Sequence, residues 1–202
     1  MKSYSAVILS SGKSKRMGFP KALLPFNERE TFLSHLIKQY KKIVQNVVIV
    51  ISQDLFEFIQ INDKKYFYSS VSYVINKYPE KGKIYSIQLG LEHLHTGFIF
   101  IQNIDNPFVT KDLLRQMITK AENNKYVVPK FDSKRGHPLL IHKSIADRIK
   151  DIREEDFNLH VLLNEFDSID CLTQDPNVLL NINTPRDYYL TFDKEYFAEE
   201  WL

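Results

Sequence analysis

The sequence predicts an α/β fold in three layers, with a mainly parallel mixed sheet between two layers of helices. Short apolar runs of four to six residues alternate along the chain with segments whose apolar residues recur every three or four positions. The first pattern is typical of buried strands and the second of amphipathic helices, and their regular alternation indicates a layered α/β fold. Because the 202 residues contain no repeat, low-complexity tract or linker, we expect a single domain over residues 1–202.

The first 129 residues follow this alternation closely. β-branched residues dominate the run 47–51, as is typical of a strand. Thr31 and Thr110 are expected to cap the helices over 31–43 and 110–123, because a threonine side chain can accept a bond from the first turn. The other expected helices are 54–61 and 83–95, and the expected strands are 4–10, 47–51, 71–75, 98–104 and 126–129.

After residue 129 the predicted elements become shorter. Residues 130–138 are expected to form a loop that leads into a short extended run over 139–141. Pro185 is expected to open the last helix, because proline fits the first helical turn. The remaining predictions are helices over 143–149 and 157–166 and strands over 168–172 and 178–182.

Composition and charge exclude several classes of protein. Basic residues number 27 and acidic residues 25, and the resulting charge of +2 argues against a general binder of nucleic acid or membrane surfaces. The most apolar window, 47–51, is far shorter than the roughly 20 residues of a membrane span, and no long apolar stretch resembles a signal peptide. The single cysteine, Cys171, can form no internal disulfide. We therefore expect a cytoplasmic protein without nucleic-acid or membrane partners.

Ligands of open α/β sheets bind beyond the carboxyl ends of the strands. This rule directs attention to the loops that follow the strands over 4–10, 98–104 and 178–182, which all carry polar residues. We expect these three loops to meet at one edge of the sheet.

The loop Ser11–Lys21 carries four cations within nine residues and two glycines, Gly12 and Gly18. Glycines allow a backbone to approach a ligand closely, and successive N–H groups in such a turn can hold an anion. Arg16 can bind phosphate oxygens in a bidentate fork, while Lys21 would act as a point charge. The alternative is a solvated basic loop. The glycine spacing fits neither a dinucleotide-binding loop nor a P-loop.

The order of residues in this loop resembles that of a known family. Residues 9–18 read Leu-Ser-Ser-Gly-Lys-Ser-Lys-Arg-Met-Gly, and Lys21 and a Leu-Leu-Pro run at 23–25 follow. The run resembles the opening motif of the nucleotidyltransferases, Leu-Ala-Ala-Gly-x-Ser-x-Arg-Met-Gly, and looks most like the branch that attaches CMP or GMP to the molybdopterin cofactor. It departs from that motif in Ser10-Ser11, which adds two hydroxyls. The resemblance implies a Rossmann-like architecture of the nucleotide-diphospho-sugar transferase (GT-A-like) type. The nucleotide-binding residues it implies are Leu9, Ser10, Ser11, Gly12, Ser14, Arg16, Lys21 and Ser86.

Asp105 is the candidate metal ligand. It follows the strand over 98–104 and precedes Pro107, so it lies at the expected ligand edge, where the alternative role is that of a turn residue. Magnesium bound to a triphosphate commonly takes one or two carboxylates. The family's corresponding strand ends in Asp-x-Pro, and its Asp holds Mg²⁺.

The segment Asn181-Ile182-Asn183-Thr184-Pro185 resembles the family's third block, which opens the last helix. Alternation along an extended strand would place Asn181 and Asn183 on one face. Their amide oxygens could ligate the metal or its waters, with Asn183 the metal candidate and Asn181 an acceptor-binding candidate. Capping of the turn before the proline is the structural alternative.

Two further blocks resemble the family more weakly. Ser86 lies in a Gly-x-x-x-Ser-x-x-x-Gly-Leu block, whose serine lies near the base and ribose. His137 lies in Gly-His-Pro-x-Leu, which is characteristic of the cytidylyltransferase branch, and is a candidate for acceptor binding as well as for a structural role.

The resemblance implies a Mg²⁺-dependent enzyme that transfers a nucleoside monophosphate, CMP from CTP by preference, to the terminal phosphate of molybdopterin and releases pyrophosphate. Arg16, Lys21 and Asp105 would be its catalytic residues. A molybdoenzyme or its chaperone would be a protein partner. Two rival interpretations stay open: a transferase for a sugar or polyol phosphate on the same scaffold, and a non-catalytic nucleotide-binding relative.

Overall fold

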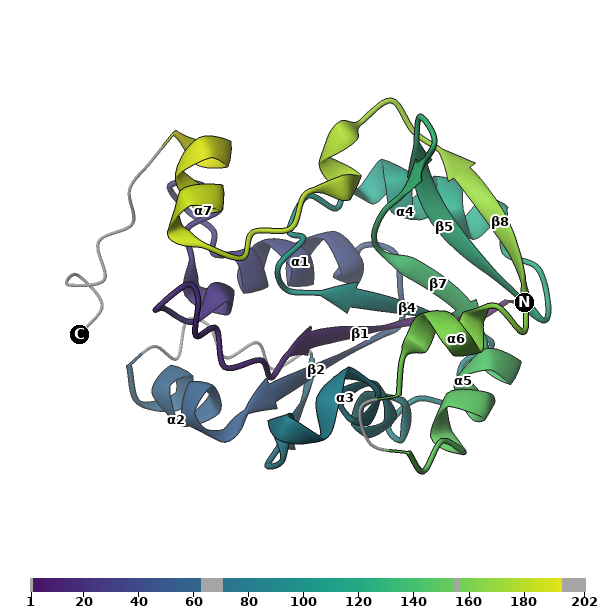
Figure 1. The fold of residues 1–202 in the computed structure, drawn as a ribbon, viewed down its shortest axis with the longest axis horizontal. Coiled ribbons are helices and arrows are strands. Elements are labelled where there is room, and N and C mark those ends of the chain that lie inside the picture. Colours follow the sequence, from purple (N-terminus) through teal and green to yellow (C-terminus); the bar gives the residue numbers. More distant parts are fainter. Residues whose placement is uncertain (1, 63–70, 155–156, 194–202) are drawn as a thin grey trace.

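The computed structural model describes residues 2–62, 71–154 and 157–193 and contains an eight-stranded mixed sheet (Figure 1). The strands are β1 (Tyr4–Ser10), β2 (Asn46–Ser52), β3 (Ser72–Asn76), β4 (Phe98–Asn103), β5 (Lys125–Phe131), β6 (Lys134–Arg135), β7 (Leu139–His142) and β8 (Asp167–Leu172). They follow the order β3-β2-β1-β4-β7-β5-β6, and β8 pairs with β5. Strands β1 to β4 run parallel, and β7 is antiparallel to β4. The predicted α/β class with a mainly parallel mixed sheet is confirmed.

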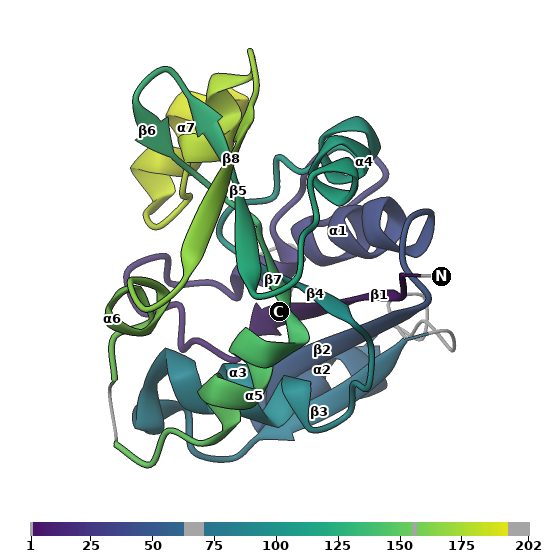
Figure 2. The ribbon, with the colours of Figure 1, turned by 90° about the vertical axis from the view of Figure 1, so that its right-hand side faces the viewer.

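Helices cover both faces of this sheet, as Figure 2 shows for α1 and α4 on one side and α3 and α5 on the other. The helices are α1 (Phe32–Lys41), α2 (Gln53–Asn62), α3 (Gly82–Leu91), α4 (Lys111–Thr119), α5 (Lys143–Lys150), α6 (Leu159–Leu163) and α7 (Pro185–Phe192). Side chains alternate along β1, so that Ala6 and Ile8 pack in the core beneath α1, α2 and α4, while Val7 and Leu9 pack beneath α3 and α5. The parallel strands are therefore buried on both faces, and this explains their continuous apolar runs.

Most element boundaries agree with the sequence. Thr31 and Thr110 cap α1 and α4 as predicted, by accepting bonds from the backbone of the first turn. The helices expected over 83–95 and 110–123 end earlier, at Leu91 and Thr119.

The loop expected over 130–138 is wrong in part, because β5 continues to Phe131 and turns back into β6. Cross-strand charges hold this hairpin against β8: Asp170 accepts bonds from Lys130 Nζ at 2.7 Å and from Arg135 Nε at 2.8 Å.

The strand expected over 178–182 is also wrong. A 3₁₀ turn, η4 (Pro176–Leu179), occupies the start of this segment. The carbonyl oxygens of this segment accept hydrogen bonds from residues outside a strand ladder. Asn106 Nδ2 donates to three of them between residues 177 and 180, and His137 N donates to the Val178 oxygen. These bonds replace a strand ladder and fix the segment that leads into α7.

Gly136 joins the hairpin to this turn at a point of close backbone approach. Its N–H donates to the Pro129 oxygen at 2.8 Å, and a methyl group on its Cα would overlap the carbonyl of Val178. We expect Gly136→Ala to lower the free energy of unfolding by about 1–3 kcal/mol, because a backbone neighbour cannot give way as a side chain can. Urea unfolding measures this loss. Gly97→Ala is the matched control, since the nearest atom to its added Cβ would be 3.8 Å away. An equal, small effect of both substitutions would contradict the proposed overlap.

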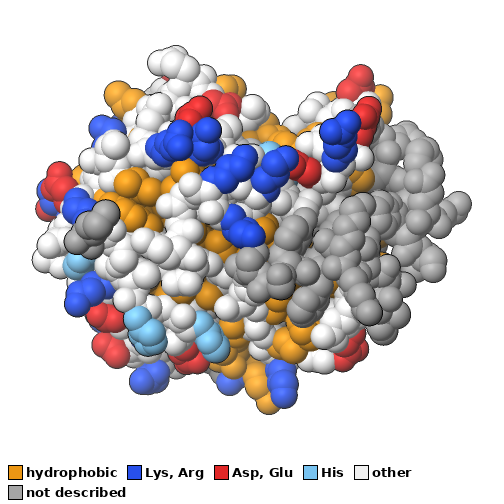
Figure 3. Space-filling view, turned by 180° about the vertical axis from the view of Figure 1, so that it is seen from behind, with side chains coloured by type: hydrophobic (Ala, Val, Ile, Leu, Met, Phe, Trp, Pro, Cys, Tyr) orange, Lys and Arg blue, Asp and Glu red, His pale blue; other side chains and the backbone are white. Residues whose placement is uncertain are grey.

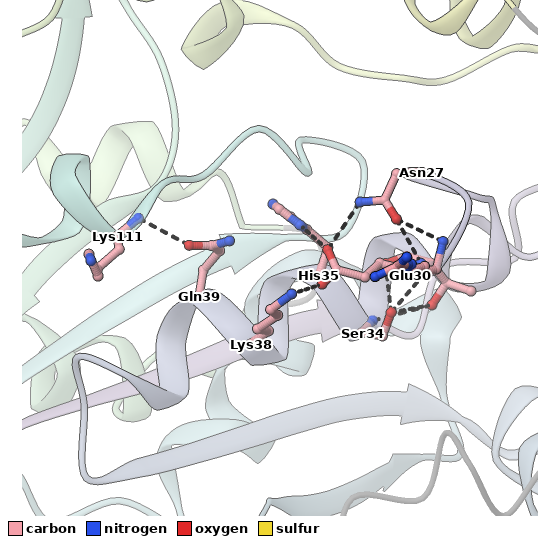
Figure 4. Close-up of polar contacts among 9 residues, drawn as sticks. Asn27, Glu30, Ser34, His35, Lys38, Gln39 and Lys111 are labelled. Atoms are coloured by element: carbon pink, nitrogen blue, oxygen red, sulfur yellow. Dashed lines mark hydrogen bonds and ion pairs between the residues drawn. The ribbon is translucent and has the colours of Figure 1, made fainter.

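The start of α1 is stabilised by a cluster around Glu30 (Figure 4). The Glu30 carboxylate accepts bonds from His35 Nδ1 at 2.8 Å, from Asn27 Nδ2 at 3.3 Å and from Lys38 Nζ. Burial by itself would raise the pKa of Glu30, but the hydrogen bonds from Lys38, His35 and Asn27 outweigh it and lower that pKa to about 2.

This low pKa predicts a pH-dependent contribution to stability. The folded-state pKa of about 2 lies below the ordinary value of 4.5, so the stabilisation is complete above about pH 5 and is lost as the pH falls toward 2. We therefore expect Glu30→Gln to lower the free energy of unfolding at pH 7 but much less at pH 3. Urea unfolding at the two pH values tests this, with the exposed neighbour Glu28→Gln as control. A Glu30→Gln deficit that is the same at both pH values would contradict the prediction.

Candidate functional site

The carboxyl ends of β1 and β4 open into a cavity of about 420 Å³, called the edge cavity below. The cavity is lined by the loop Ser11–Lys21, called the first-strand loop below, and by the start of α3, the end of β4 and the segment before α7. This agrees with the rule that ligands bind beyond the carboxyl ends of the strands. The predicted site residues that line it are Leu9, Ser11, Gly12, Ser14, Arg16, Lys21, Ser86, Asp105 and Asn183. Residues up to 174 positions apart in the sequence therefore meet in one hollow.

The first-strand loop is a tight turn built on left-handed residues. Ser14 has φ 46° and Gly18 φ 71°, and the N–H groups of Met17 and Gly18 both donate to the Ser14 oxygen. Glycine favours this conformation at position 18. A Cβ added at Gly12 would meet no protein atom within 4 Å, so the space beside this residue is open to a ligand. The loop exposes its cations, since Lys13, Lys15 and Arg16 are all solvent-exposed.

Lys21 lies where the loop meets the segment before α7. Its Nζ donates to Asn183 Oδ1 at 2.7 Å and lies 3.7 Å from Asp105 Oδ2. Arg16 Nη2 approaches the same amide oxygen at 3.4 Å. Burial lowers the pKa of Lys21, and the charge of Asp105 opposes that shift. Asn183 thus brings the two predicted phosphate-binding cations together beside the predicted metal ligand.

Asp105 has an oxygen that could bind a further group. Its backbone oxygen accepts a bond from Ile182 N at 2.7 Å, which attaches the segment before α7 to the end of β4. Its side-chain Oδ1 is buried and has no hydrogen-bond partner among the described residues. A buried carboxylate oxygen without a partner carries a desolvation cost that a bound cation would remove. Asp105 could therefore hold a divalent metal ion, which would supply the missing partner of this oxygen.

The structure shows which residue caps α7, a role that the sequence leaves open to an asparagine of the segment before Pro185. Thr184, rather than an asparagine, caps this helix, and Asp187 Oδ2 accepts bonds from the backbone N–H groups of Asn183 and Thr184. The side chain of Asn183 is therefore left for Lys21 and Arg16. Asn181 is exposed and lies outside the edge cavity, so the structure does not place it beside Asn183.

Sequence reasoning missed Asn76, which ends β3. Its Nδ2 donates to Ser86 Oγ at 3.0 Å, and Ser86 Oγ lies 3.0 Å from Ser11 Oγ. All three side chains are buried. Asn76 and Ser10 line a neighbouring hollow of about 670 Å³, which shares part of its lining with the edge cavity. The rule that ligands bind at carboxyl ends of parallel strands could have found Asn76, because β3 ends there.

His137 lies in a second hollow of about 520 Å³, called the side cavity below. Its Nε2 is 3.4 Å from Asn103 Nδ2. Burial, together with the charge of Lys83, lowers the pKa of His137 to about 4, so its imidazole is neutral at pH 7. Lys83 lines both the side cavity and the edge cavity. Sequence reasoning did not single it out, because a lysine near the start of a helix reads as a solvated residue.

A larger hollow of about 900 Å³ lies away from these residues, against the Asn27–Glu30 turn and α1. Figure 3 shows Lys and Arg side chains on the upper part of the back face with acidic side chains between them. In this hollow the cation Lys38 is already paired with Glu30. Size alone therefore does not identify the site. In the edge cavity, by contrast, Arg16 and Lys21 both donate to the Asn183 amide oxygen, and Lys21 also lies 3.7 Å from the Asp105 carboxylate. Within the described residues, no helix is long and apolar enough to span a membrane.

Comparisons with known proteins identify the family to which this chain belongs. The family model of the MobA-like NTP transferase domain matches residues 6–169. The chain is 26% identical over 193 residues to a probable molybdenum cofactor guanylyltransferase of Flavobacterium johnsoniae, an alignment that covers 95% of this chain and 92% of that protein.

Two solved structures share the fold. A nucleotidyl transferase from Methanothermobacter thermautotroptrophicus is 20% identical with a TM-score of 0.80, over 96% of this chain and 97% of that chain. The Mycobacterium tuberculosis protein Rv0371c in complex with manganese is 16% identical with a TM-score of 0.76, over 96% and 100% of the two chains. Both confirm the nucleotide-diphospho-sugar transferase type of fold that the loop motif implied. Because the family model covers most of its length, the chain belongs to the MobA-like NTP transferase family, the molybdenum cofactor nucleotidyltransferases.

Proposed function

We propose that this protein, acting as one unit over residues 1–202, transfers a nucleoside monophosphate from an NTP to the terminal phosphate of a molybdopterin-type acceptor. One observation carries the proposal: the cationic first-strand loop and Asp105, whose Oδ1 is buried without a hydrogen-bond partner among the described residues, line the same cavity at the carboxyl edge of the sheet. In the reaction, an acceptor phosphate oxygen forms a bond to the α-phosphorus. The bond from that phosphorus to the β-phosphate oxygen breaks, and pyrophosphate leaves.

The proposed work of the protein is alignment and charge stabilisation. The acceptor phosphate is already ionised, so no protein nucleophile is needed. Arg16 and Lys21 hold the triphosphate and stabilise the charge that develops on the α-phosphate and the leaving group. Backbone N–H groups between Gly12 and Gly18 would add further donors. Asn183 positions both cations before the nucleotide arrives.

A divalent metal ion, Mg²⁺ in our proposal, fits the donors of the edge cavity. Asp105 would hold the ion through the buried Oδ1. The amide oxygen of Asn183, which lies 2.7 Å from Lys21 Nζ, is the second candidate ligand. One carboxylate with phosphate oxygens and waters is a common magnesium environment. When bound, the ion neutralises charge on the phosphates. The manganese in the Mycobacterium tuberculosis structure supports a divalent ion in this fold.

The base of the nucleotide is proposed to lie beside Leu9, Ser10, Ser11 and Ser86. Two observations favour different bases. The Gly-His-Pro run at 136–138 predicts CTP as donor, whereas curated relatives such as that of Flavobacterium johnsoniae are named guanylyltransferases, which favours GTP. CTP stays a prediction of the sequence, and both nucleotides belong in the test.

The acceptor is proposed to enter through the side cavity. This cavity combines apolar walls from Val128, Leu139 and Leu163 with the neutral imidazole of His137. Such a lining suits a flat heterocycle that accepts and donates hydrogen bonds. Asn181, exposed and outside the edge cavity, would contribute only at the rim.

The proposal is tested by measuring pyrophosphate release with molybdopterin, Mg²⁺ and each of GTP, CTP, ATP and UTP, with the dinucleotide product identified by mass spectrometry. We expect product with GTP or CTP. Pyrophosphate release only with a sugar or polyol phosphate as acceptor would contradict the proposed molybdopterin acceptor. Nucleotide binding without pyrophosphate release for any acceptor would identify a non-catalytic nucleotide-binding protein and overturn the proposal.

A further inference from the structure

Lys83 occupies a place between the two cavities that no other described lysine shares. It is the second residue of α3 and follows Gly82, whose φ of 84° turns the chain out of the preceding 3₁₀ turn, η3 (Pro79–Lys81). Its side chain is exposed and lines both the edge cavity and the side cavity. Among the described residues, no hydrogen bond or ion pair holds its ammonium group. An unpaired cation therefore stands where the nucleotide and acceptor spaces meet.

Lys83 interacts electrostatically with one residue of each cavity, Asp105 and His137. Nearby protein removes part of the water around the ammonium group and lowers the pKa of Lys83, while the charge of Asp105 opposes this shift. Water still reaches the side chain because it lies in a hollow rather than in the core. The charge of Lys83 is in turn one cause of the low pKa of His137. Lys83 thus acts on the metal-ligand candidate in one cavity and on the histidine of the other.

The neighbouring lysine shows what a surface cation on this segment does otherwise. Lys81 Nζ lies 5.3 Å from the ring centre of Tyr78 and 5.4 Å from that of Tyr85. These contacts are typical cation–π interactions. Lys81 lines neither cavity. It therefore provides a matched comparison: the same residue type, two positions away, with a local partner and no access to the proposed reaction space.

We propose that Lys83 binds the acceptor phosphate and brings its oxygen up to the α-phosphate of the NTP. The inference rests on the proposed nucleotidyl transfer and deepens it. Two anionic phosphates must approach to about 3–3.5 Å before the new P–O bond can form, and their repulsion opposes this approach. Arg16 and Lys21, the proposed triphosphate ligands, line the edge cavity but not the side cavity. Lys83 supplies the cation on the acceptor side, as a point charge on a flexible stem.

The kinetic test compares Lys83→Met, Lys83→Arg and the control Lys81→Met, with the transfer reaction measured at varied molybdopterin and at varied NTP. We expect Lys83→Met to lower kcat/KM for molybdopterin about tenfold or more, with the Kd for NTP and Mg²⁺ changed less than about threefold. Lys83→Arg should recover part of the loss, and Lys81→Met should behave as the unaltered protein. An unchanged kcat/KM for molybdopterin in Lys83→Met, or an equal loss of NTP affinity, would overturn the inference.

A second measurement separates this inference from the transfer reaction itself. Lysines of the unaltered protein are acylated with a limiting amine reagent, and labelling at Lys83 and Lys81 is followed by peptide mass spectrometry. We expect molybdopterin to protect Lys83 but not Lys81. Protection in a protein that releases no pyrophosphate would keep the acceptor site and reject the proposed function. Active transfer with Lys83 labelled equally in the presence and absence of molybdopterin would reject the inference alone.

Discussion

Replacing Lys21 by alanine should lower the turnover number by about 100-fold or more. Its ammonium group lies 2.7 Å from Asn183 Oδ1 and 3.7 Å from Asp105 Oδ2, and the side chain is only 12% exposed. A cation held in such a place can stabilise charge in the transition state by ~3 kcal/mol, which corresponds to roughly two powers of ten in rate. Steady-state kcat with saturating NTP, Mg²⁺ and molybdopterin measures the effect.

The control for Lys21→Ala is Lys42→Ala, which removes an exposed cation at the end of α1, away from the edge cavity. We expect the control to keep its full rate. Lys21→Arg should lie between the two, because it retains the charge but presents it as a planar fork. Thermal unfolding of each variant checks that the fold is intact. A folded Lys21→Ala protein with a rate within threefold of the original would contradict the role of Lys21.

Replacing Asp105 by alanine or asparagine should cost a similar factor, on the order of 100-fold, and should raise the metal concentration needed for half-maximal rate. The proposed cause is the loss of the buried Oδ1 as a metal ligand. Because this oxygen has no hydrogen-bond partner among the described residues and Oδ2 forms only a long ion pair of 3.7 Å with Lys21, Asp105→Asn should lower the free energy of unfolding by no more than about 1 kcal/mol. Rate, metal dependence and urea unfolding together measure the effect.

A large loss of activity with little change in stability is the informative combination for Asp105. It separates a functional group from one that the fold requires. Asp112→Asn serves as control, since this exposed carboxylate lies in the first turn of α4, away from the edge cavity. If Asp105→Asn keeps its rate and metal dependence, the metal site lies elsewhere.

The sequence was sufficient to predict the meeting of Lys21 and Asp105. Parallel strands β1 and β4 are neighbours, and their carboxyl ends open at one edge, so loops that follow them must face each other. The apolar runs marked both strands, because strands buried on both faces lack polar interruptions. The motif resemblance supplied only the chemistry expected of that edge.

Contacts between distant segments explain what the sequence could not predict. Residues 178–182 read as a strand, but Asn106 and His137 take the carbonyl groups that a neighbouring strand would need. The β5–β6 hairpin depends on Asp170, which lies on another strand and neutralises Lys130 and Arg135. Such bonds join residues 35 or more positions apart, where local periodicity carries no signal.

The roles of the functional side chains also depend on contacts that the sequence alone could not predict. Asn183 was expected to ligate a metal or cap a turn. The structure shows that Thr184 is the cap and that the Asn183 amide oxygen accepts bonds from Lys21 and Arg16, while its role as a metal ligand stays a prediction. Lys83 carries no local signal, because only the packing of α3 against the rest of the sheet places it between two cavities.

The most direct test of the account is a crystal structure of the protein with a non-hydrolysable NTP analogue and Mn²⁺, with the ion located by its anomalous scattering. We predict that the triphosphate lies on the Gly12–Gly18 loop with Arg16 and Lys21 at its oxygens, and that Mn²⁺ is bonded directly to the Asp105 carboxylate. A triphosphate bound outside the edge cavity, or a metal ion away from Asp105, would contradict the account.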